Sequence, residues 1–470
     1  MLHPLIKELL QSPPDGRTVC IKGWVKTVRD MKNLVFAEIS DGSCFAGIQC
    51  TFDRGNLDAK TSELLNTLTT GAAVEIEGNL NASPAAGQAV EVSAVKLSLL
   101  GDAPAEAAGT VAAYPLQKKR HSLEFLREIA HLRPRTNTFG AIARIRNRLA
   151  FAIHEFFQSR NFYYVNTPII SGSDAEGAGS LFQVTTLDLA ALAKTGKAPD
   201  YANDFFGKWT GLAVTGQLEA EAYASALTRV YTFGPTFRAE NSNTTRHLAE
   251  FWMIEPEAAF MDLEDNMQLA EDFLKHLLQT LLKDCAEDMD FFNNHVEKGI
   301  LDTLQSVAKA KFSRMTYTDA VKELEKAASN FEFKPFWGCD LQSEHEKFLS
   351  EKVAGGPVIV TDYPKEIKAF YMKLNDDGKT VRAMDVLVPR LGEIIGGSQR
   401  EENADKLEKR MLEMNMKPAD YSWYFDLRHY GTVPHSGFGL GFERFIQYVT
   451  GMVNIRDVIP FPRTPGNAEF

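Results

Sequence analysis

The chain has 470 residues, 44% of them hydrophobic, and a formal net charge of −11. This length can hold two or three domains with separate cores, and the acidic balance excludes a protein that coats nucleic acid without selectivity. No apolar run approaches the roughly 18 residues of a membrane span. Five scattered cysteines without a Cys-x-x-Cys pair, and an N-terminus without an export signal, predict reduced thiols, no zinc site and a cytoplasmic location.

Residues 18–100 alternate between short apolar strands and turns rich in Gly and Asp. The predicted strands cover residues 19–21, 34–39, 45–49, 74–76 and 90–92. Short strands at this spacing predict a small β-barrel over residues 1–100, and their order resembles the OB-fold. OB-folds commonly bind single-stranded nucleic acid on aromatic side chains.

Residues 101–113 are almost all Ala, Gly, Pro or acidic, a composition that predicts a flexible linker. We expect the linker and a hinge to occupy residues 101–137. Between Gln117 and Arg148, nine Lys and Arg residues stand against two Glu, a local charge of +7. Such a basic band in an acidic protein is either a solvated helix face or a surface that contacts an RNA backbone.

The pattern then changes, and we expect one large domain over residues 138–470. Apolar residues at helical spacing over 142–157 predict a helix, followed by a strand that ends at Pro168. A proline in a strand belongs at an edge or an interface. The later strands are separated by turns and short loops, which favours an antiparallel sheet flanked by helices, an α+β fold. Residues 264–330 are predicted to be a helical insertion.

Two separated segments each carry an arginine in a setting suited to phosphate. Residues 233–255 form a predicted strand–loop–strand unit with Arg238 at its bend, and a glycine-rich strand leads to Arg444. A guanidinium group forks onto phosphate oxygens and keeps its charge, and glycine lets the backbone approach a ligand closely. Alternatively, each arginine forms a surface ion pair with a nearby acid, Glu240 or Glu443. The Gly-x-x-x-x-Gly-Lys-Ser/Thr loop of other ATP enzymes is absent from the sequence.

These segments resemble motifs 2 and 3 of the class II aminoacyl-tRNA synthetases, in the subclass for aspartate, asparagine and lysine. The strings that carry the resemblance are Gly-Pro-Thr-Phe-Arg-Ala-Glu-Asn-Ser-Asn-Thr (234–244), Gly-Gly-Ser-Gln-Arg-Glu-Glu (396–402) and Asn-Ile-Arg-Asp-Val-Ile-Pro-Phe-Pro-Arg-Thr-Pro (454–465). They are most similar to the bacterial asparaginyl branch, and the resemblance covers nearly the whole chain. It implies activation of asparagine with ATP, transfer to the 3′-terminal adenosine of tRNA(Asn), and a homodimer formed through the motif 1 region near Pro168.

The resemblance also implies an ATP site that binds Mg²⁺. Its residues are Arg238, Glu240, Arg246, His247, Phe251, Glu393, Gly441 and Arg444. The implied catalytic residues are Arg238, Glu393 and Arg444. The substrate carboxylate is already a nucleophile, so alignment and charge neutralisation suffice for catalysis. Arg238 is expected on the α-phosphate, Arg444 on the γ-phosphate, and Phe251 on adenine, although Phe251 is alternatively a core residue of its strand.

The expected magnesium ligands are Glu393 and Asp385, because one or two carboxylates are the usual share that a protein contributes. In many relatives of the aspartyl branch the corresponding acids lie seven residues apart. Here the separation is eight, so Asp385 alternatively caps a turn.

The residues that the resemblance implies for the amino-acid pocket are Glu176, Gln217, Glu221, Glu255 and Arg400. Aspartyl enzymes typically place a lysine where this chain has Ala220. An amide substrate needs one hydrogen-bond donor for its oxygen and one acceptor for its NH2 group. We expect Arg400 to be the donor and Glu221 to be the acceptor. Alternatively, Glu221 is a solvent-facing acid. A buried acceptor would repel a carboxylate, so asparagine is favoured. The alternatives are a nondiscriminating aspartyl-tRNA synthetase and a synthetase-like enzyme that forms free asparagine, although the latter paralogues lack the barrel.

The barrel is expected to bind the anticodon of the tRNA. By resemblance, Phe36 stacks on the middle anticodon base, Gln49 reads an edge of that base, and Arg29 contacts a nearby phosphate. Phe36 lies in an apolar run, so it is alternatively part of the barrel core.

Overall fold

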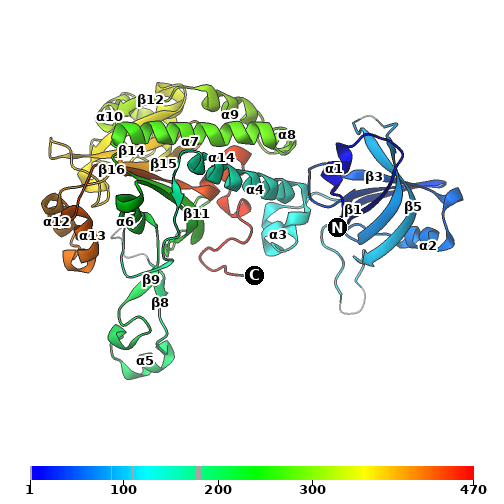
Figure 1. The fold of residues 1–470 in the computed structure, drawn as a ribbon, viewed down its shortest axis with the longest axis horizontal. Helices are drawn as coiled ribbons and strands as arrows, with labels where there is room; N and C mark the ends of the chain where they lie inside the picture. The colour runs from blue at the N-terminus through cyan, green and yellow to red at the C-terminus, as the bar shows by residue number, and fades with distance from the viewer. Residues whose placement is uncertain (1–2, 86, 108–110, 176–180) are drawn as a thin grey trace. The chain divides into compact units, whose positions relative to one another are not determined.

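The structure is a computed structural model that describes residues 3–85, 87–107, 111–175 and 181–470. The chain divides into two compact units, Met1–Arg144 and Ile145–Phe470 (Figure 1). Within the described ranges, no helix has the length and apolar character needed to cross a membrane. All five cysteines lie within the described residues and none forms a disulfide, as the sequence predicts.

The first unit is built on a closed five-stranded barrel, in the order β1-β2-β3-β5-β4. Its strands are β1 (Thr18–Met31), β2 (Leu34–Ser40), β3 (Ile48–Asp53), β4 (Ala73–Ala82) and β5 (Val90–Gly101). β3 pairs with β5 in parallel, and the other pairs are antiparallel. Two helices accompany the barrel, α1 (Ile6–Leu10) and α2 (Ala59–Thr67). The predicted OB-type barrel is therefore confirmed, but the third strand begins later than residue 45, where the sequence pattern places it.

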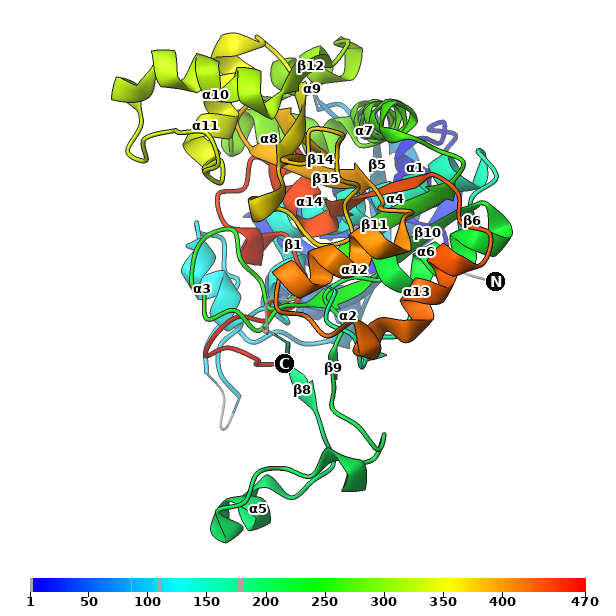
Figure 2. The ribbon, with the colours of Figure 1, turned by 90° about the vertical axis from the view of Figure 1, so that its left-hand side faces the viewer.

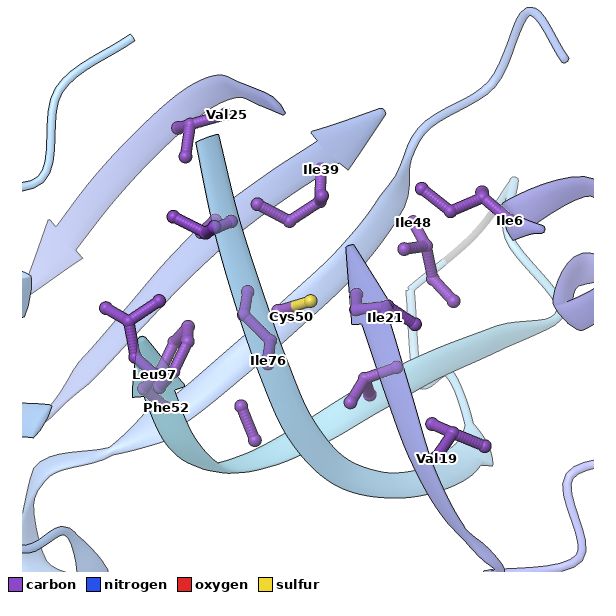
Figure 3. Packing of buried hydrophobic residues seen from close by; sticks show 14 of the residues in the cluster. Ile6, Val19, Ile21, Val25, Ile39, Ile48, Cys50, Phe52, Ile76 and Leu97 are labelled. Carbon is purple, nitrogen blue, oxygen red and sulfur yellow. The ribbon is translucent and has the colours of Figure 1, made fainter. Parts of the chain in front are cut away.

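Strand alternation fills the barrel. In β2, Val35, Ala37 and Ile39 are buried and belong to the hydrophobic core, whereas Phe36 is only partly buried. Side chains from the other strands complete the core, with Cys50 and Ile76 near its centre (Figure 3). Because successive strand residues face opposite sides, every second position of β2 is left for the outer face.

The basic band does not form one continuous exposed face. Helix α3 (Leu123–Glu128) lies within it. Arg133 is buried and its guanidinium lies 4.3 Å from the centre of the Phe139 ring. In the second unit, Arg146 pairs with Glu443 at 2.8 Å. Several of these cations therefore have structural partners, which leaves fewer of them for an RNA backbone.

The second unit is organised around an eight-stranded sheet, in the order β12-β13-β14-β15-β16-β11-β10-β6. Its strands are β6 (Tyr163–Tyr164), β10 (Arg229–Phe237), β11 (Glu250–Ala259), β12 (Ser313–Thr316), β13 (Val358–Pro364), β14 (Thr380–Val388), β15 (Gly392–Gln399) and β16 (His435–Gly441). The central pairs are antiparallel, whereas the edge pairs β12·β13 and β10·β6 are parallel. The predicted antiparallel arrangement is therefore correct for the centre of the sheet, whereas the complete sheet is mixed.

Helices surround this sheet. The longest are α4 (Asn137–Gln158) and α7 (Leu263–Asp284), and both carry a buried apolar stripe. Apart from the helix of the arm described below, the others in this unit are α6 (Gln217–Leu227), α8 (Ala286–His295), α9 (Ile300–Lys309), α10 (Tyr317–Lys326), α11 (Ser343–Phe348), α12 (Ala404–Glu413), α13 (Ser422–His429) and α14 (Phe442–Thr450). Helix α7 runs across β14, β15 and β16 (Figure 1).

Two segments differ from the sequence pattern. Residues 264–330 are mostly helical, but they also contain β12, which extends the main sheet beside β13. The strand expected to end at Pro168 is limited to β6, which pairs with β10 only at Tyr163 and Tyr164.

An arm that the sequence pattern did not predict projects from the second unit (Figures 1 and 2). It contains helix α5 (Leu189–Thr195) and is rooted in a small sheet with the order β7-β9-β8. The strands of that sheet are β7 (Ile170–Ser171), β8 (Gln183–Val184) and β9 (Thr210–Leu212).

Candidate active site

The β10–β11 hairpin places Arg238 just beyond the end of β10. The Arg238 N–H donates to the carbonyl of Ala249 at 3.0 Å, which closes the base of the loop. The Arg238 guanidinium lies 5.6 Å from the centre of the Phe251 ring. Phe251 itself is half-buried on β11, so the alternative that it is a core residue is wrong. A cation and an aromatic face therefore border the same space, which suits a nucleotide.

Arg444 does not pair with the acid beside it. Glu443 instead contacts Arg146 at 2.8 Å and accepts the Trp252 N–H at 2.8 Å. Burial raises the pKa values of Glu346 and Glu393, and the positive charge of Arg444 opposes that rise, so its charge lies near those two acids. The surface ion pair between Arg444 and Glu443 is thus wrong.

A cluster of buried and half-buried acids lies near these arginines. Asp385 on β14 and Glu393 on β15 both face the position of Gly396, where an added Cβ would lie 2.9 Å from Glu393 Oε1 and 3.5 Å from Asp385 Oδ1. A register shift between Val386 and Leu387 marks a bulge in the β14–β15 pair. Because one extra residue moves a side chain to the other face of a strand, the bulge brings both acids to one side despite their separation of eight residues.

Asp385 does not cap a turn, because it lies within β14 and forms an ion pair with Lys368 at 2.7 Å. Burial and the charge of Asp385 raise the pKa of Glu393. Burial and the charge of Glu393 raise the pKa of Glu346 to about 7. Asp385 and Glu393, which are costly to ionise together and lie near arginines, would suit a divalent cation beside a phosphate.

The loop between β10 and β11 contributes a second arginine and a histidine. Arg246 donates to the Ser343 hydroxyl on α11. Burial and the positive charge of Arg444 lower the pKa of Arg246, so a polyphosphate between the two arginines would relieve their repulsion. The His247 ring contacts the Thr244 hydroxyl at 2.5 Å, and Glu240 lies 4.0 Å from the same ring.

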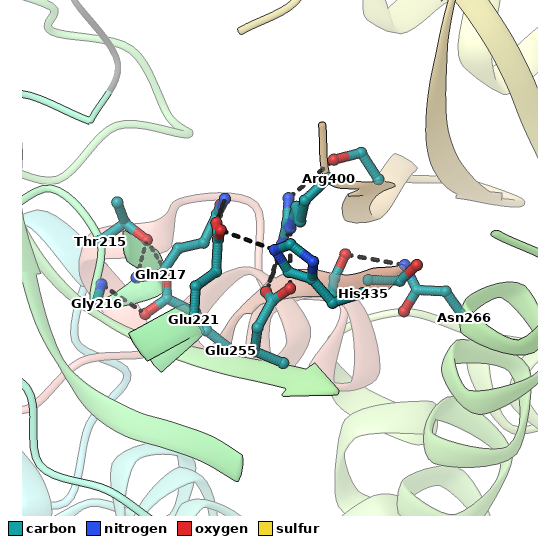
Figure 4. A network of polar contacts seen from close by, with 12 residues as sticks. Thr215, Gly216, Gln217, Glu221, Glu255, Asn266, Arg400 and His435 are labelled. Carbon is teal, nitrogen blue, oxygen red and sulfur yellow. Dashed lines mark hydrogen bonds and ion pairs between the residues drawn. The ribbon is translucent and has the colours of Figure 1, made fainter. Parts of the chain in front are cut away.

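Glu221, one of the residues predicted for the amino-acid pocket, is the centre of a polar cluster and is 2% exposed. Its carboxylate accepts from Tyr424 at 2.8 Å, contacts His435 at 3.0 Å, and pairs with Arg428 at 2.7 Å. Gln217, one turn earlier on α6, also donates to it at 3.1 Å (Figure 4). The alternative of a solvent-facing acid is therefore wrong. Burial alone would raise the pKa of Glu221, but Arg428 and His435 outweigh it and hold that pKa below its ordinary value.

Arg400 lies beside this cluster, at the end of β15 (Figure 4). Its Nη2 donates to Glu257 Oε2 at 2.8 Å, and its Nη1 donates to the Ser398 hydroxyl at 2.8 Å. Glu257 was not among the sequence predictions. It follows Glu255 by two residues on β11, so strand periodicity, which places both on one face, is the signal that could have found it.

The carboxylate of Glu255 accepts from the Thr215 hydroxyl, from the Gly216 N–H at 3.0 Å and from the Thr232 hydroxyl at 3.0 Å (Figure 4). These donors fix the carboxylate beside the start of α6. Glu176, the remaining predicted pocket residue, lies outside the described residues.

Glu221, Glu257 and His435 have potential ligand atoms within 4.8 Å of one another, which is compatible in spacing with a metal ion. Two buried arginines, Arg400 and Arg428, already neutralise the two carboxylates. The cluster is therefore explained as an ion-pair network rather than as a cation site.

The predicted anticodon residues gather on one outer face of the barrel. Arg29 of β1 pairs in register with Phe36 of β2, and Gln49 lies on the neighbouring strand β3. Because Phe36 alternates with the inward-facing residues of β2, the alternative that it is barrel core is wrong. Gln49 donates to Glu91 at 3.2 Å, and sequence reasoning missed Glu91.

Glu91 is the centre of a polar network on this face. Besides Gln49, it accepts from Thr51 at 3.4 Å and from Ser83 at 3.1 Å. A single acid in an alternating strand carries no local signal of such a role, because its partners come from β3 and from the loop that precedes β5.

Comparisons with known proteins agree with this geometry. Residues 122–465 match the family of class II tRNA synthetases (D, K and N), and residues 19–100 match the OB-fold nucleic acid binding domain. The asparagine–tRNA ligase of Treponema denticola is 62% identical, with 100% of both chains covered, and that of a Synechocystis species is 58% identical, with 99% of both covered. The asparaginyl-tRNA synthetase of Pyrococcus horikoshii, solved with asparaginyl-adenylate, has a TM-score of 0.86 at 34% identity and covers 100% of this chain and 99% of its own.

Proposed function

The chain belongs to the class II tRNA synthetases of the D, K and N family, and we propose on that basis that it joins asparagine to tRNA(Asn). The match along the whole chain to relatives named asparagine–tRNA ligases carries this assignment. A carboxylate oxygen of asparagine attacks the α-phosphorus of ATP, a new P–O bond forms, and pyrophosphate leaves. The 3′-terminal adenosine of the tRNA then attacks the carbonyl carbon through a hydroxyl group, and AMP leaves.

For the first step, we assign Arg238 to the α-phosphate and the substrate carboxylate. The guanidinium of Arg238 beside the Phe251 ring supports an adenylate that lies against both, with Glu240 near the adenine amino group. Charge stabilisation of this kind, rather than acid–base chemistry, supplies most of the catalysis expected of an in-line displacement.

Arg444 and Arg246 are assigned to the γ-phosphate, with His247 beside them on the loop. Their mutual repulsion supports this role, because an anion between them would remove it. Gly441 precedes α14 and leaves the backbone open to the nucleotide.

We assign Mg²⁺ to Glu393 and Asp385. Oxygen ligands and nearby phosphates are what Mg²⁺ prefers, and the room left by Gly396 between the two acids supports the fit. When bound, the ion would neutralise phosphate charge. The ion pair with Lys368 holds the Asp385 carboxylate in place.

Selection of asparagine rests on two side chains in this proposal. Arg400 donates to the side-chain oxygen of the substrate, and Glu221 accepts from its NH2 group. Because Arg428 keeps Glu221 ionised, aspartate would meet a like charge. Gln217 and Glu255 are assigned to the substrate ammonium group, together with Glu176. A nondiscriminating aspartyl enzyme is disfavoured because Ala220 stands where such enzymes have a lysine.

Three further assignments complete the proposal. We place the anticodon domain at residues 1–100, the linker at 101–137 and the catalytic domain at 138–470. Exposed apolar residues around Pro168, including Tyr163, Ile169 and Ile170, support a homodimer through this region. A cytoplasmic location is supported by the free cysteines.

The test is ATP–pyrophosphate exchange with asparagine and aspartate compared side by side. We expect exchange with asparagine to be at least ~10³-fold more efficient, because a site built around a polar group rejects analogues that leave it repelled or unpaired. Comparable exchange with aspartate would overturn the assignment and favour the aspartyl alternative.

A further inference from the structure

Helix α11 and the segment after it touch two different parts of the nucleotide site. The Ser343 hydroxyl, at the start of α11, accepts from Arg246 of the β10–β11 loop. Three residues later, Glu346 Oε2 accepts the backbone N–H of Glu393 at 3.1 Å. Residues at this spacing lie on one face of a helix, so a single helical turn joins an arginine assigned to phosphate with a carboxylate assigned to the metal.

The contact between Glu346 and the β14–β15 hairpin is tight. Glu346 is 9% exposed. Gly392, next to Glu393, has a φ of +93°, and an added Cβ there would lie 2.3 Å from Glu346 Oε2. The hairpin is tied a second time to the helical segment η5 (Leu349–Val353), since the Arg390 N–H donates to Glu351 at 2.8 Å. The position of the β14–β15 hairpin therefore depends on the positions of α11 and η5.

We propose that Glu346 and Ser343 are positioning residues for the activation step, and that α11 fixes the distance between Arg246 and Glu393. The inference rests on the proposed function. Removing the Glu346 carboxylate leaves the Glu393 N–H without its acceptor, and it frees the hairpin to shift. A misplacement of about 1 Å at a reacting centre reduces rates by as much as ~10²-fold.

The test compares Glu346→Gln with Glu346→Ala in asparagine-dependent ATP–pyrophosphate exchange. A glutamine oxygen still accepts the Glu393 N–H, so Glu346→Gln keeps kcat/KM for ATP within about threefold of wild type. Glu346→Ala lowers it by about tenfold to a hundredfold, while the KM for asparagine stays unchanged. If Glu346→Gln lowers kcat/KM for ATP as much as Glu346→Ala does, and the variant requires more Mg²⁺, then the charge of Glu346 itself serves the metal. That result overturns the positioning role.

Two further variants keep the test sharp. Glu344, on the same helix, accepts the Glu332 and Phe333 N–H groups at 3.0 and 2.8 Å. Glu344→Ala is therefore a matched control, because it removes a carboxylate that accepts from backbone N–H groups away from the site. We expect it to leave kcat/KM for ATP unchanged. Ser343→Ala lowers kcat/KM for ATP several-fold without altering the Mg²⁺ dependence. A wild-type kcat/KM for ATP in this variant refutes the proposal even if Glu346→Ala does not fold. Wild-type protein without asparagine-dependent exchange would instead refute the proposed function.

Discussion

Truncation of Phe36 separates RNA binding from barrel packing. Phe36 faces outward from β2, whereas Phe52 of β3 is 0% exposed within the same barrel. If Phe36 stacks on a base, Phe36→Ala removes about 1–3 kcal/mol of RNA binding, which corresponds to roughly a fivefold to 150-fold loss of kcat/KM for tRNA. Exchange without tRNA should be nearly unchanged, because the activation residues lie in the other unit.

Phe52→Ala is the matched control for this experiment. It removes the same side chain from a closed core, so the barrel should lose about 3–5 kcal/mol of stability. For a domain of this size that lowers the midpoint of its thermal transition by at least about 10 °C. Aminoacylation, exchange and thermal unfolding are measured on both variants. The reasoning is refuted if Phe36→Ala destabilises the barrel as much as Phe52→Ala, or if it charges tRNA as well as wild type.

Four other substitutions test the catalytic unit. Arg238→Ala and Arg444→Ala should each slow exchange by roughly 10²-fold or more with little change in thermal unfolding, because each serves developing charge on phosphate; a stable variant with normal exchange contradicts this role. Glu221→Gln should narrow the preference for asparagine over aspartate and also destabilise the protein, because Arg428 loses its buried partner; an unchanged preference contradicts the selectivity argument. Gly396→Ala should raise the KM for ATP, since its Cβ would enter the space between the two acids; a normal KM argues against a magnesium site there.

The sequence pattern predicts the barrel well where strands alternate strictly and less well where a turn contains apolar residues. Phe45 extends the apparent third strand backwards, yet β3 begins at Ile48. The Asp41 carboxylate accepts the Ser43 N–H at 2.9 Å, and Gly47 packs against Glu38, where an added Cβ would lie 2.7 Å from its Cγ. These contacts hold residues 41–47 as a loop, and side-chain hydrogen bonding of this kind competes with strand pairing.

The site residues also divide into those that the sequence reveals and those that it does not. Those within long specific strings, such as Arg238 and Arg400, are recognisable because the string itself is informative. Arg428, Glu346 and Glu91 stand in segments without such strings, and their roles arise only when distant elements meet. Arg428 reaches Glu221 across 207 positions of the chain, and no local periodicity encodes a contact of that separation.

The pair of acids assigned to magnesium shows why distance along the chain is a poor guide to distance on a sheet. A regular hairpin places side chains on one face only when their pairing partners keep a strict register. The shift between Val386 and Leu387 breaks that register, and the same hairpin contains Arg390 at a φ of +74° and Gly392 at +93°. Such backbone persists only where surrounding contacts determine it. The hydrogen bonds from the Glu393 and Arg390 N–H groups to Glu346 and Glu351 hold the hairpin backbone in this conformation. The position of Glu393 therefore depends on α11 and η5 as much as on the strand that carries it.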